Sequence, residues 1–146
     1  MLGSAEPGLI LTPPPANVDD PKALERDDGY LTASEIATLK LDAEWVVLSA
    51  CNTAGASGEN SEALSGLARA FFYAGTRALL VSHWYVSSDA AVKLTTRAFA
   101  ELRANPQIGR AEALRRSMAE LITKGAPHEA HPATWAPFVL VGEGSR

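Results

Sequence analysis

Two short apolar runs, separated by a stretch with helical spacing, constrain the fold of this chain more than any other feature. The runs are residues 45–51, WVVLSAC, and residues 77–82, RALLVS, and neither has the 3.6-residue period of an amphipathic helix. Runs of this length are typical of strands buried on both faces, as in parallel sheets. Between them, apolar residues recur at helical spacing over residues 62–74, and Gly75 follows where a helix end favours glycine. This order predicts an α/β protein.

The remaining segments extend the alternation over the whole chain. Thr32-Ala33-Ser34-Glu35 has the form of a capping box, which predicts a helix start at this point. Ser87 or Ser88 is expected to cap a later helix. In all, we predict strands at residues 8–11, 45–50, 77–82 and 138–141, and helices at residues 32–39, 62–74, 88–104 and 108–123. Residues 1–146 are therefore expected to form a single domain, a three-layer α/β/α sandwich around a mostly parallel sheet.

Composition and charge narrow the kinds of partner. The 146 residues suffice for one domain, and the single cysteine excludes a disulfide framework or a multi-cysteine zinc site within them. Residues 1–60 hold three Lys or Arg and ten Asp or Glu. Residues 61–146 hold ten Lys or Arg and seven Asp or Glu. Neither half has a strong basic stripe, and no apolar run approaches ~20 residues, so we expect no nucleic acid and no membrane as partner. The N-terminus lacks the pattern of a secretory signal, which makes the cytoplasm the expected location.

Cys51 is the first candidate for chemistry. It stands where the strand over residues 45–50 is predicted to end, and ligands of open α/β sheets bind beside the carboxyl ends of strands. A thiol at this position is either a small core residue or a nucleophile. A nucleophilic thiol needs a base, which is normally a histidine. His83 follows the next predicted strand and comes near Cys51 if the two strands are neighbours.

The other histidines do not predict a metal centre. His128, Glu129 and His131 lie in a proline-containing stretch before the last strand, and their spacing suits no rigid helical pair of ligands. The glycine-bearing stretch at residues 52–60 lacks the Gly-Lys-Ser/Thr ending of a phosphate-binding loop. We therefore predict neither a metal ion nor an organic cofactor.

The segment around Cys51 resembles a known family. Residues 46–53, VVLSACNT, resemble the strand and nucleophile signature S-A-C-x-T-G of the CHAT domain, although the glycine, Gly55, comes one residue late. CHAT domains are caspase- and separase-like cysteine peptidases, usually found behind tetratricopeptide repeats. Further matches follow the family's order, at residues 29–36 (GYLTASEI), 66–75 (GLARAFFYAG), 82–86 (SHWYV) and in the closing stretch 131–142. The resemblance covers residues 8–142 and implies a caspase-like sandwich.

Carried onto this sequence, the resemblance implies that Cys51 is the nucleophile of peptide-bond hydrolysis. It would attack the scissile carbonyl and form a thioester, which water then hydrolyses. The family's base is a histidine followed by glycine, on a strand that precedes the segment matched by residues 8–11. That strand would lie upstream of Met1, so we expect the C-terminal portion of a CHAT domain, incomplete on its N-terminal side and inactive in this form. The expected partners are a peptide or protein substrate and either the missing N-terminal half of the domain or a tetratricopeptide-repeat region.

Three alternatives remain open at this point. The chain is a non-catalytic interaction module if Cys51 serves only as a packing residue. His83 is a substitute base if its ring reaches Cys51. Asp89 and Trp84 bind substrate if they line a pocket, because separases use an acidic residue in this region to receive a basic side chain; Asp89 is otherwise simply a favourable acid at a helix N-terminus. An unpaired sheet edge would also favour a homodimer.

Overall fold

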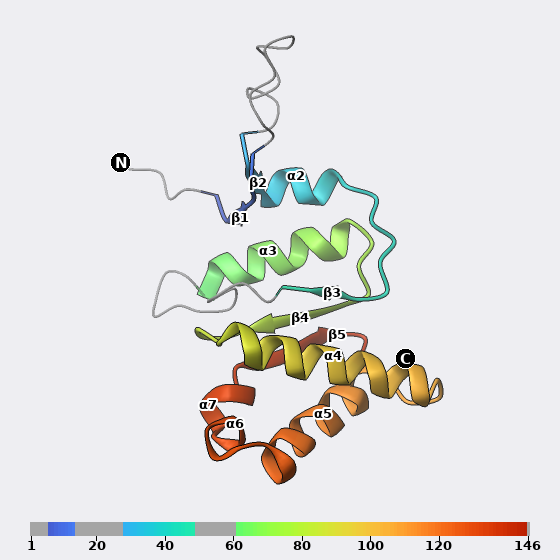
Figure 1. The fold of residues 1–146 in the computed structure, drawn as a ribbon. Helices are drawn as coiled ribbons and strands as arrows, with labels where there is room; N and C mark the ends of the chain where they lie inside the picture. The colour runs from blue at the N-terminus through green and yellow to red at the C-terminus, as the bar shows by residue number, and fades with distance from the viewer. Residues whose placement is uncertain (1–5, 14–27, 49–60, 146) are drawn as a thin grey trace.

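Helices cover both faces of a small sheet in the computed structural model, which describes residues 6–13, 28–48 and 61–145 (Figure 1). Helices α2 (Ala33–Thr38) and α3 (Ser61–Tyr73) lie on one side of the sheet, and α4 (Ser88–Ala104) and α5 (Arg110–Lys124) lie on the other. The prediction of an α/β protein with helices on both faces of the sheet is confirmed.

The sheet is mixed, and the prediction of a mostly parallel sheet is wrong for the described residues. Its three strands, in spatial order, are β3 (Val46–Val47), β4 (Ala78–Ser82) and β5 (Phe138–Gly142). Strand β4 pairs with β3 in parallel and with β5 in antiparallel orientation.

The number of helices in each connection explains the strand directions. One helix, α3, carries the chain from the end of β3 back to the start of β4, so the two strands run in parallel. After β4, α4 runs along the sheet and α5 returns beside it, so the chain arrives again at the end of β4. Phe138 therefore pairs with Ser82, and β5 runs in the opposite direction.

Alternate side chains of β4 belong to two separate cores. Leu79 and Val81 point to the α2–α3 side, whereas Leu80 points to the α4–α5 side, as the period of two in a strand requires. The first core contains Ala33, Ile36, Leu67, Ala70 and Phe71 with the two strand residues. The second contains Val86, Ala90, Ala91, Leu94, Leu114 and Phe138 with Leu80. Because both faces are covered, all five residues of β4 are buried.

A separate two-stranded ribbon lies beside α2. Strands β1 (Gly8–Ile10) and β2 (Tyr30–Thr32) pair antiparallel, and Leu9 and Leu31 pack against the first core. Strand β1 was predicted at residues 8–11, whereas β2 was not predicted, and its last residue, Thr32, begins the helix predicted at residues 32–39. Only a partner strand reveals β2, because its three residues are too few to show an alternating pattern.

The predicted helix ends are confirmed where local chemistry determines them. Thr32 and Glu35 form the predicted capping box of α2, with Glu35 N–H donating to Thr32 Oγ1 at 3.2 Å and Thr32 N–H donating to Glu35 Oε2 at 2.8 Å. Ser87 caps α4 by accepting from Ala90 N–H. Gly75 follows α3 with a φ of 93°, a conformation that favours glycine.

Two short helices interrupt the stretch that we predicted as a loop before β5. These are α6 (Pro127–Ala130) and α7 (Pro132–Trp135). Each begins with a proline, which is favoured at the first position of a helix because it has no N–H to leave unpaired. The prolines were therefore a signal in the sequence for these helix starts, which our prediction of a loop missed.

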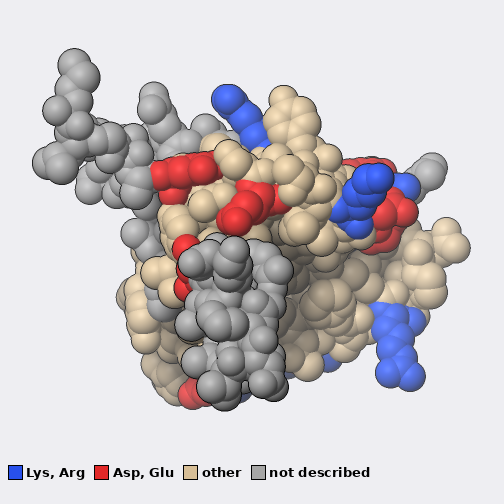
Figure 2. Space-filling view, turned by 90° about the horizontal axis from the view of Figure 1, so that it is seen from above, with Lys and Arg blue, Asp and Glu red and all other residues tan. Residues whose placement is uncertain are grey.

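Acidic and basic side chains are interspersed on the side of the molecule that carries the ribbon and α2. Figure 2 shows Lys and Arg side chains at separate places on this face, with Asp and Glu side chains among them. No helix among the described residues is long and apolar enough to cross a membrane.

Candidate functional site at the ends of β3 and β4

The parallel pairing of β3 with β4 brings the carboxyl ends of both strands to one edge of the sheet. Val47 is in register with Leu80, and Leu48 N–H donates to the Leu80 carbonyl at 2.8 Å. Such an edge is where ligands of open α/β sheets bind. The chain leaves β3 toward Cys51 at the edge where β4 leads into His83. Cys51 itself lies outside the described residues, so its role and its distance from His83 remain predictions.

His83 directly follows β4 and is held there through its backbone. Its N–H donates to the Pro137 carbonyl at 3.0 Å, and its side chain is exposed. The imidazole is therefore accessible at the predicted edge, as a base or a surface residue would be. This placement agrees with the sequence prediction that His83 ends its strand.

Trp84 is fixed by a hydrogen bond and is still partly open to solvent. Its indole Nε1 donates to the Ala133 carbonyl of α7 at 3.3 Å, and 44% of the residue is exposed. Tyr85 is 70% exposed, whereas Val86 turns into the second core. An aromatic ring that is fixed in place and partly exposed to solvent is suited to contact a ligand. A substrate-binding role for Trp84 remains a prediction.

Asp89 lies in the first turn of α4, immediately after the Ser87 cap. A carboxylate in this position is stabilised by the partial positive charge of the helix N-terminus. Asp89 also contributes, as the smallest cause, to raising the pKa of Lys93 one turn further along the helix. These interactions agree with the structural alternative for Asp89, and its pocket role remains a prediction.

Lys93 and Glu129 join α4 to α6 through an ion pair. The hydrogen bond with Glu129 is the largest cause of the raised pKa of Lys93, and the same bond is the largest cause of the lowered pKa of Glu129. Glu129 also accepts from Ala126 N–H at 2.8 Å, which further lowers its pKa. Each group therefore favours the charged form of the other.

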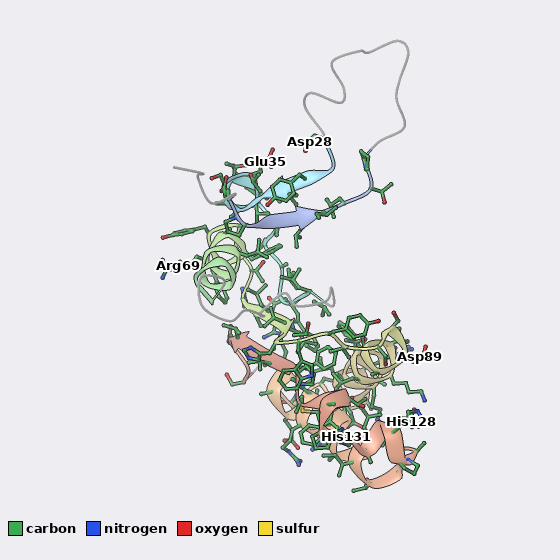
Figure 3. The ribbon with its side chains drawn as sticks, turned by 90° about the vertical axis from the view of Figure 1, so that its left-hand side faces the viewer. Asp28, Glu35, Arg69, Asp89, His128 and His131 are labelled. Carbon is green, nitrogen blue, oxygen red and sulfur yellow. The ribbon has the colours of Figure 1, made fainter. Side chains whose placement is uncertain are left out.

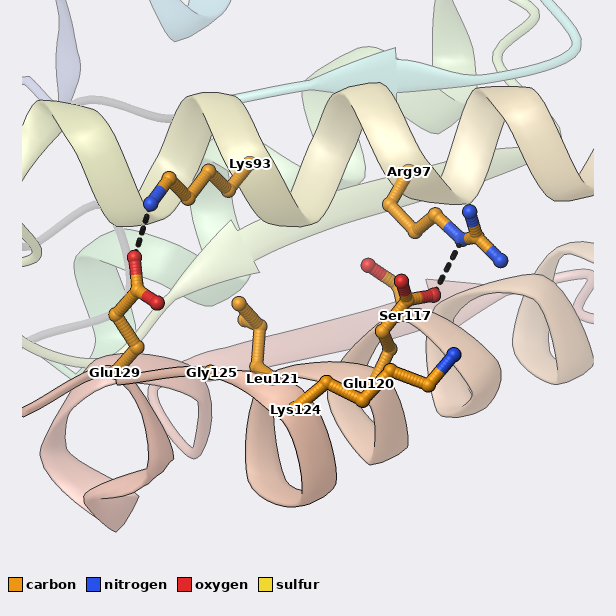
Figure 4. A pocket seen from close by; sticks show the side chains of 8 residues that line it. All are labelled: Lys93, Arg97, Ser117, Glu120, Leu121, Lys124, Gly125 and Glu129. Carbon is orange, nitrogen blue, oxygen red and sulfur yellow. Dashed lines mark hydrogen bonds and ion pairs between the residues drawn. The ribbon is translucent and has the colours of Figure 1, made fainter. Parts of the chain in front are cut away.

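A cavity of about 230 Å³ lies between α4 and the segment formed by α5 and α6. Figure 4 shows Lys93 and Arg97 reaching from α4 toward Glu129 and Glu120 across this cavity. Arg97 Nε lies 2.8 Å from Glu120 Oε2. Lys93 and Arg97 are thus each paired with a carboxylate across the cavity, and these pairs join the helices, while Lys124 adds a third positive charge to the lining.

His128 and His131 form no metal-ligand group with other described side chains. Figure 3 shows His128 and His131 on the same side of the sheet as Asp89, with Glu35 and Arg69 on the opposite side. His131 Nδ1 accepts from Ala133 N–H at 3.2 Å, so this ring caps α7. In the part of the chain that the structure describes, no three His, Cys, Asp or Glu side chains are grouped to hold a metal ion.

The family model described as "CHAT domain" matches residues 4–143, which is nearly the whole chain. The chain belongs to the CHAT domain family. Its matched segment contains the SAC stretch, both parallel strands and all the helices described above. The resemblance noted in the sequence is thereby confirmed.

Two curated relatives are similar to this chain. Tetratricopeptide repeat protein 28 of Mus musculus and that of Homo sapiens are each 32% identical to the chain over 117 residues, or 77% of its length. The match spans only 4% of the length of either relative. No solved structure matches the chain.

Proposed function

We propose that this CHAT domain is the nucleophile-bearing part of a cysteine peptidase, with Cys51 as the nucleophile. The observation that carries the proposal is the parallel β3–β4 pair, because Cys51 follows β3 in the sequence and His83 follows β4. The family match over residues 4–143 supports the same assignment. A caspase-like arrangement of the complete domain belongs to this proposal.

The reaction requires a thiolate at Cys51. The sulfur attacks the carbonyl carbon of a peptide bond, the amine leaves with a proton from the base, and a thioester forms. Water then attacks the thioester, the base takes one of its protons, and the acid product leaves as the thiol is restored. A free thiol is only a few per cent ionised near neutral pH, so a neighbouring base determines the rate.

The mechanism also requires a general base, which must come from a histidine within or outside this chain. All three histidines follow Cys51 in the sequence, whereas the histidine implied by the family resemblance precedes the nucleophile. We propose that the base comes from a segment outside residues 1–146 and that the chain alone hydrolyses no peptide. His83 as a substitute base is the alternative, supported by its exposed position at the end of β4.

We propose that this segment attaches along the outer side of β3, where a further strand could pair with it. Strand β3 ends the order β3-β4-β5, and its outer edge pairs with no described strand. An open edge offers unpaired backbone groups to another strand. The names of the two relatives support a tetratricopeptide-repeat region as a further partner. A second copy of the chain at this edge would give a homodimer instead.

The test is the rate of iodoacetamide alkylation as a function of pH. Cys51 is the only thiol, so the curve reports one group. For this chain alone we expect a midpoint at or above about 8.5, the value of an unassisted thiol. A protein that joins the chain to a family segment bearing His-Gly should lower the midpoint and cleave peptides, and Cys51→Ala should abolish cleavage.

Variants at the histidines separate the alternatives. A midpoint well below 8.5 in the chain alone, restored by His83→Asn and unchanged by His128→Asn, would make His83 the base. An unactivated thiol and no cleavage even in the joined protein would overturn the peptidase proposal. The chain would then be a non-catalytic interaction module that keeps the CHAT fold.

A further inference from the structure

Trp84 is connected to the α6–α7 segment through a single backbone unit, Ala133. The Ala133 carbonyl accepts from Trp84 Nε1 at 3.3 Å, and the Ala133 N–H donates to His131 Nδ1 at 3.2 Å. One residue therefore joins a titratable ring to the tryptophan that follows β4. This connection involves residues that our sequence analysis did not link.

Several other interactions also hold α7, among them the packing of Trp135 against the second core. Thr134 Oγ1 donates to the His128 carbonyl at 2.8 Å, and Trp135 Nε1 donates to the Ala130 carbonyl at 3.1 Å. Both helices of the segment are four residues long and have no fully buried side chain. A helix this short depends strongly on its capping interaction, since it has few internal hydrogen bonds.

The hydrogen bond to His131 exists only in one protonation state. A ring nitrogen that accepts from an N–H carries no proton itself, so His131 must be neutral with its proton on Nε2. Protonation of Nδ1 turns this acceptor into a donor, which then faces the Ala133 N–H. It also places a positive charge at the N-terminus of α7, which the helix dipole disfavours.

We propose that the α6–α7 segment is a proton-sensitive clasp on Trp84, in which His131 is the sensing residue. Protonation of His131 releases the Ala133 N–H, loosens the first turn of α7 and weakens the hydrogen bond that orients the Trp84 indole. Deprotonation restores both bonds. Since Trp84 follows His83 at the end of β4, the clasp links pH to the edge of the sheet described above.

Other ionisable groups near α7 could also respond to pH and must be distinguished from His131. Of the elements that pack against α7, α6 contains His128 and Glu129 and α4 contains Asp89 and Lys93, while His83 at the end of β4 donates its N–H to the Pro137 carbonyl just after α7. Glu129 and Lys93 each raise the stability of the other's charged form through their ion pair. Imidazoles are the side chains whose ordinary ionisation falls between about pH 5 and 8. The other imidazoles on these elements are those of His83 and His128.

Indole N–H resonances in a ¹H–¹⁵N spectrum test the clasp directly. The chain has three tryptophans, and the Trp84 resonance is identified by its loss in Trp84→Phe. Between pH 8 and 5 we expect this resonance to move along a one-proton titration curve in the wild type. His131→Asn keeps a capping side chain without a titrating group, so it should remove at least about nine-tenths of the displacement. His128→Asn and His83→Asn are matched controls that should titrate like the wild type.

Two results would overturn the clasp. One is a Trp84 resonance that does not move in the wild type, and the other is a displacement that persists in His131→Asn. A second measurement needs no variant, because ¹⁵N shifts of the His131 ring at pH 8 report its tautomer; a proton on Nδ1 instead of Nε2 contradicts the proposal. Neither readout depends on Cys51 or on a substrate, so failure of the clasp is distinct from failure of the peptidase proposal.

Discussion

The two helical layers of this protein pack against the same three strands by different means. On the α2–α3 side, apolar side chains such as Ile36 and Phe71 fill the space against β4. On the α4–α5 side, an apolar core adjoins a group of ion pairs, in which Arg116 of α5 contacts Glu101 of α4 and also Glu112 one turn earlier on α5. Both layers contain a pair of helices packed on each other. The core of the first pair is apolar, whereas the second pair is also joined by ion pairs.

The polar contacts of the second layer include a buried hydroxyl. Ser117 of α5 is fully buried and donates from Oγ to the Leu94 carbonyl of α4 at 2.7 Å. At the start of α5, Arg110 is also buried and donates to the Glu143 carbonyl at 3.3 Å. These contacts hold α5 against α4 and against the end of β5. The second layer therefore depends more on the pairing of polar groups than the first.

The largest effects should come from the cores themselves. Leu79 and Leu80 are adjacent, fully buried and point to opposite layers. Leu79→Ala and Leu80→Ala should each lower the free energy of unfolding by about 2–5 kcal/mol, because each leaves a cavity in a packed core. Urea unfolding measures both, with Ile10→Ala at an exposed position as the control, expected within about 0.5 kcal/mol of wild type. A loss below about 1 kcal/mol for either leucine would mean that its layer is not packed against the sheet.

Smaller effects should come from the helix caps, one in each layer. Thr32→Ala removes the cap of α2, and Ser87→Ala removes the cap of α4. Each should lower the free energy of unfolding by about 1 kcal/mol, since a helix N–H loses its partner. Thr32→Ser and Ser87→Thr keep the hydroxyl and should recover most of the loss. If these variants are as unstable as the alanine variants, loss of the capping hydrogen bond does not explain the lower free energy of unfolding.

The smallest effect should be a pH dependence confined to the second layer. Hydrogen bonds from Arg115 and then Arg116 lower the pKa of Glu112 to about 2. A carboxyl whose pKa is lower in the folded state stabilises the fold above its unfolded pKa, about 4.3, and loses this contribution as the pH falls toward 2. Glu112→Gln should flatten the decline in stability over that range.

The measurement for Glu112 is urea unfolding at a series of pH values from 5 to 2. The exposed Glu143→Gln serves as the control. We expect a small difference, because Arg115 is largely exposed and Arg116 and Glu112 are partly exposed, and water screens such pairs. Equal pH slopes for Glu112→Gln and wild type would show that the ion pairs of Glu112 contribute nothing measurable.

Local patterns predicted much of the fold correctly. The apolar run around Leu79 and Leu80, the capping box at Thr32 and Gly75 after α3 all match the structure. Family membership was also predictable, because the SAC stretch and the flanking motifs are contiguous in the sequence. The site was only partly predictable: His83 ends its strand as expected, while Cys51 lies outside the described residues.

The features that could be predicted from the sequence depend on neighbours three or four residues away. Helix starts and glycine turns are of this kind, since their hydrogen bonds and conformations are local. A buried strand is also visible in the sequence as a contiguous apolar run, although its hydrogen bonds are made to distant strands. Only the tertiary structure decided the direction of β5, the pairing of β2 and the contact between Trp84 and Ala133. These depend on how α4 and α5 fold back on the sheet and on partners 20 or more residues apart. A backbone hydrogen bond across such a distance leaves no pattern in the residues that make it.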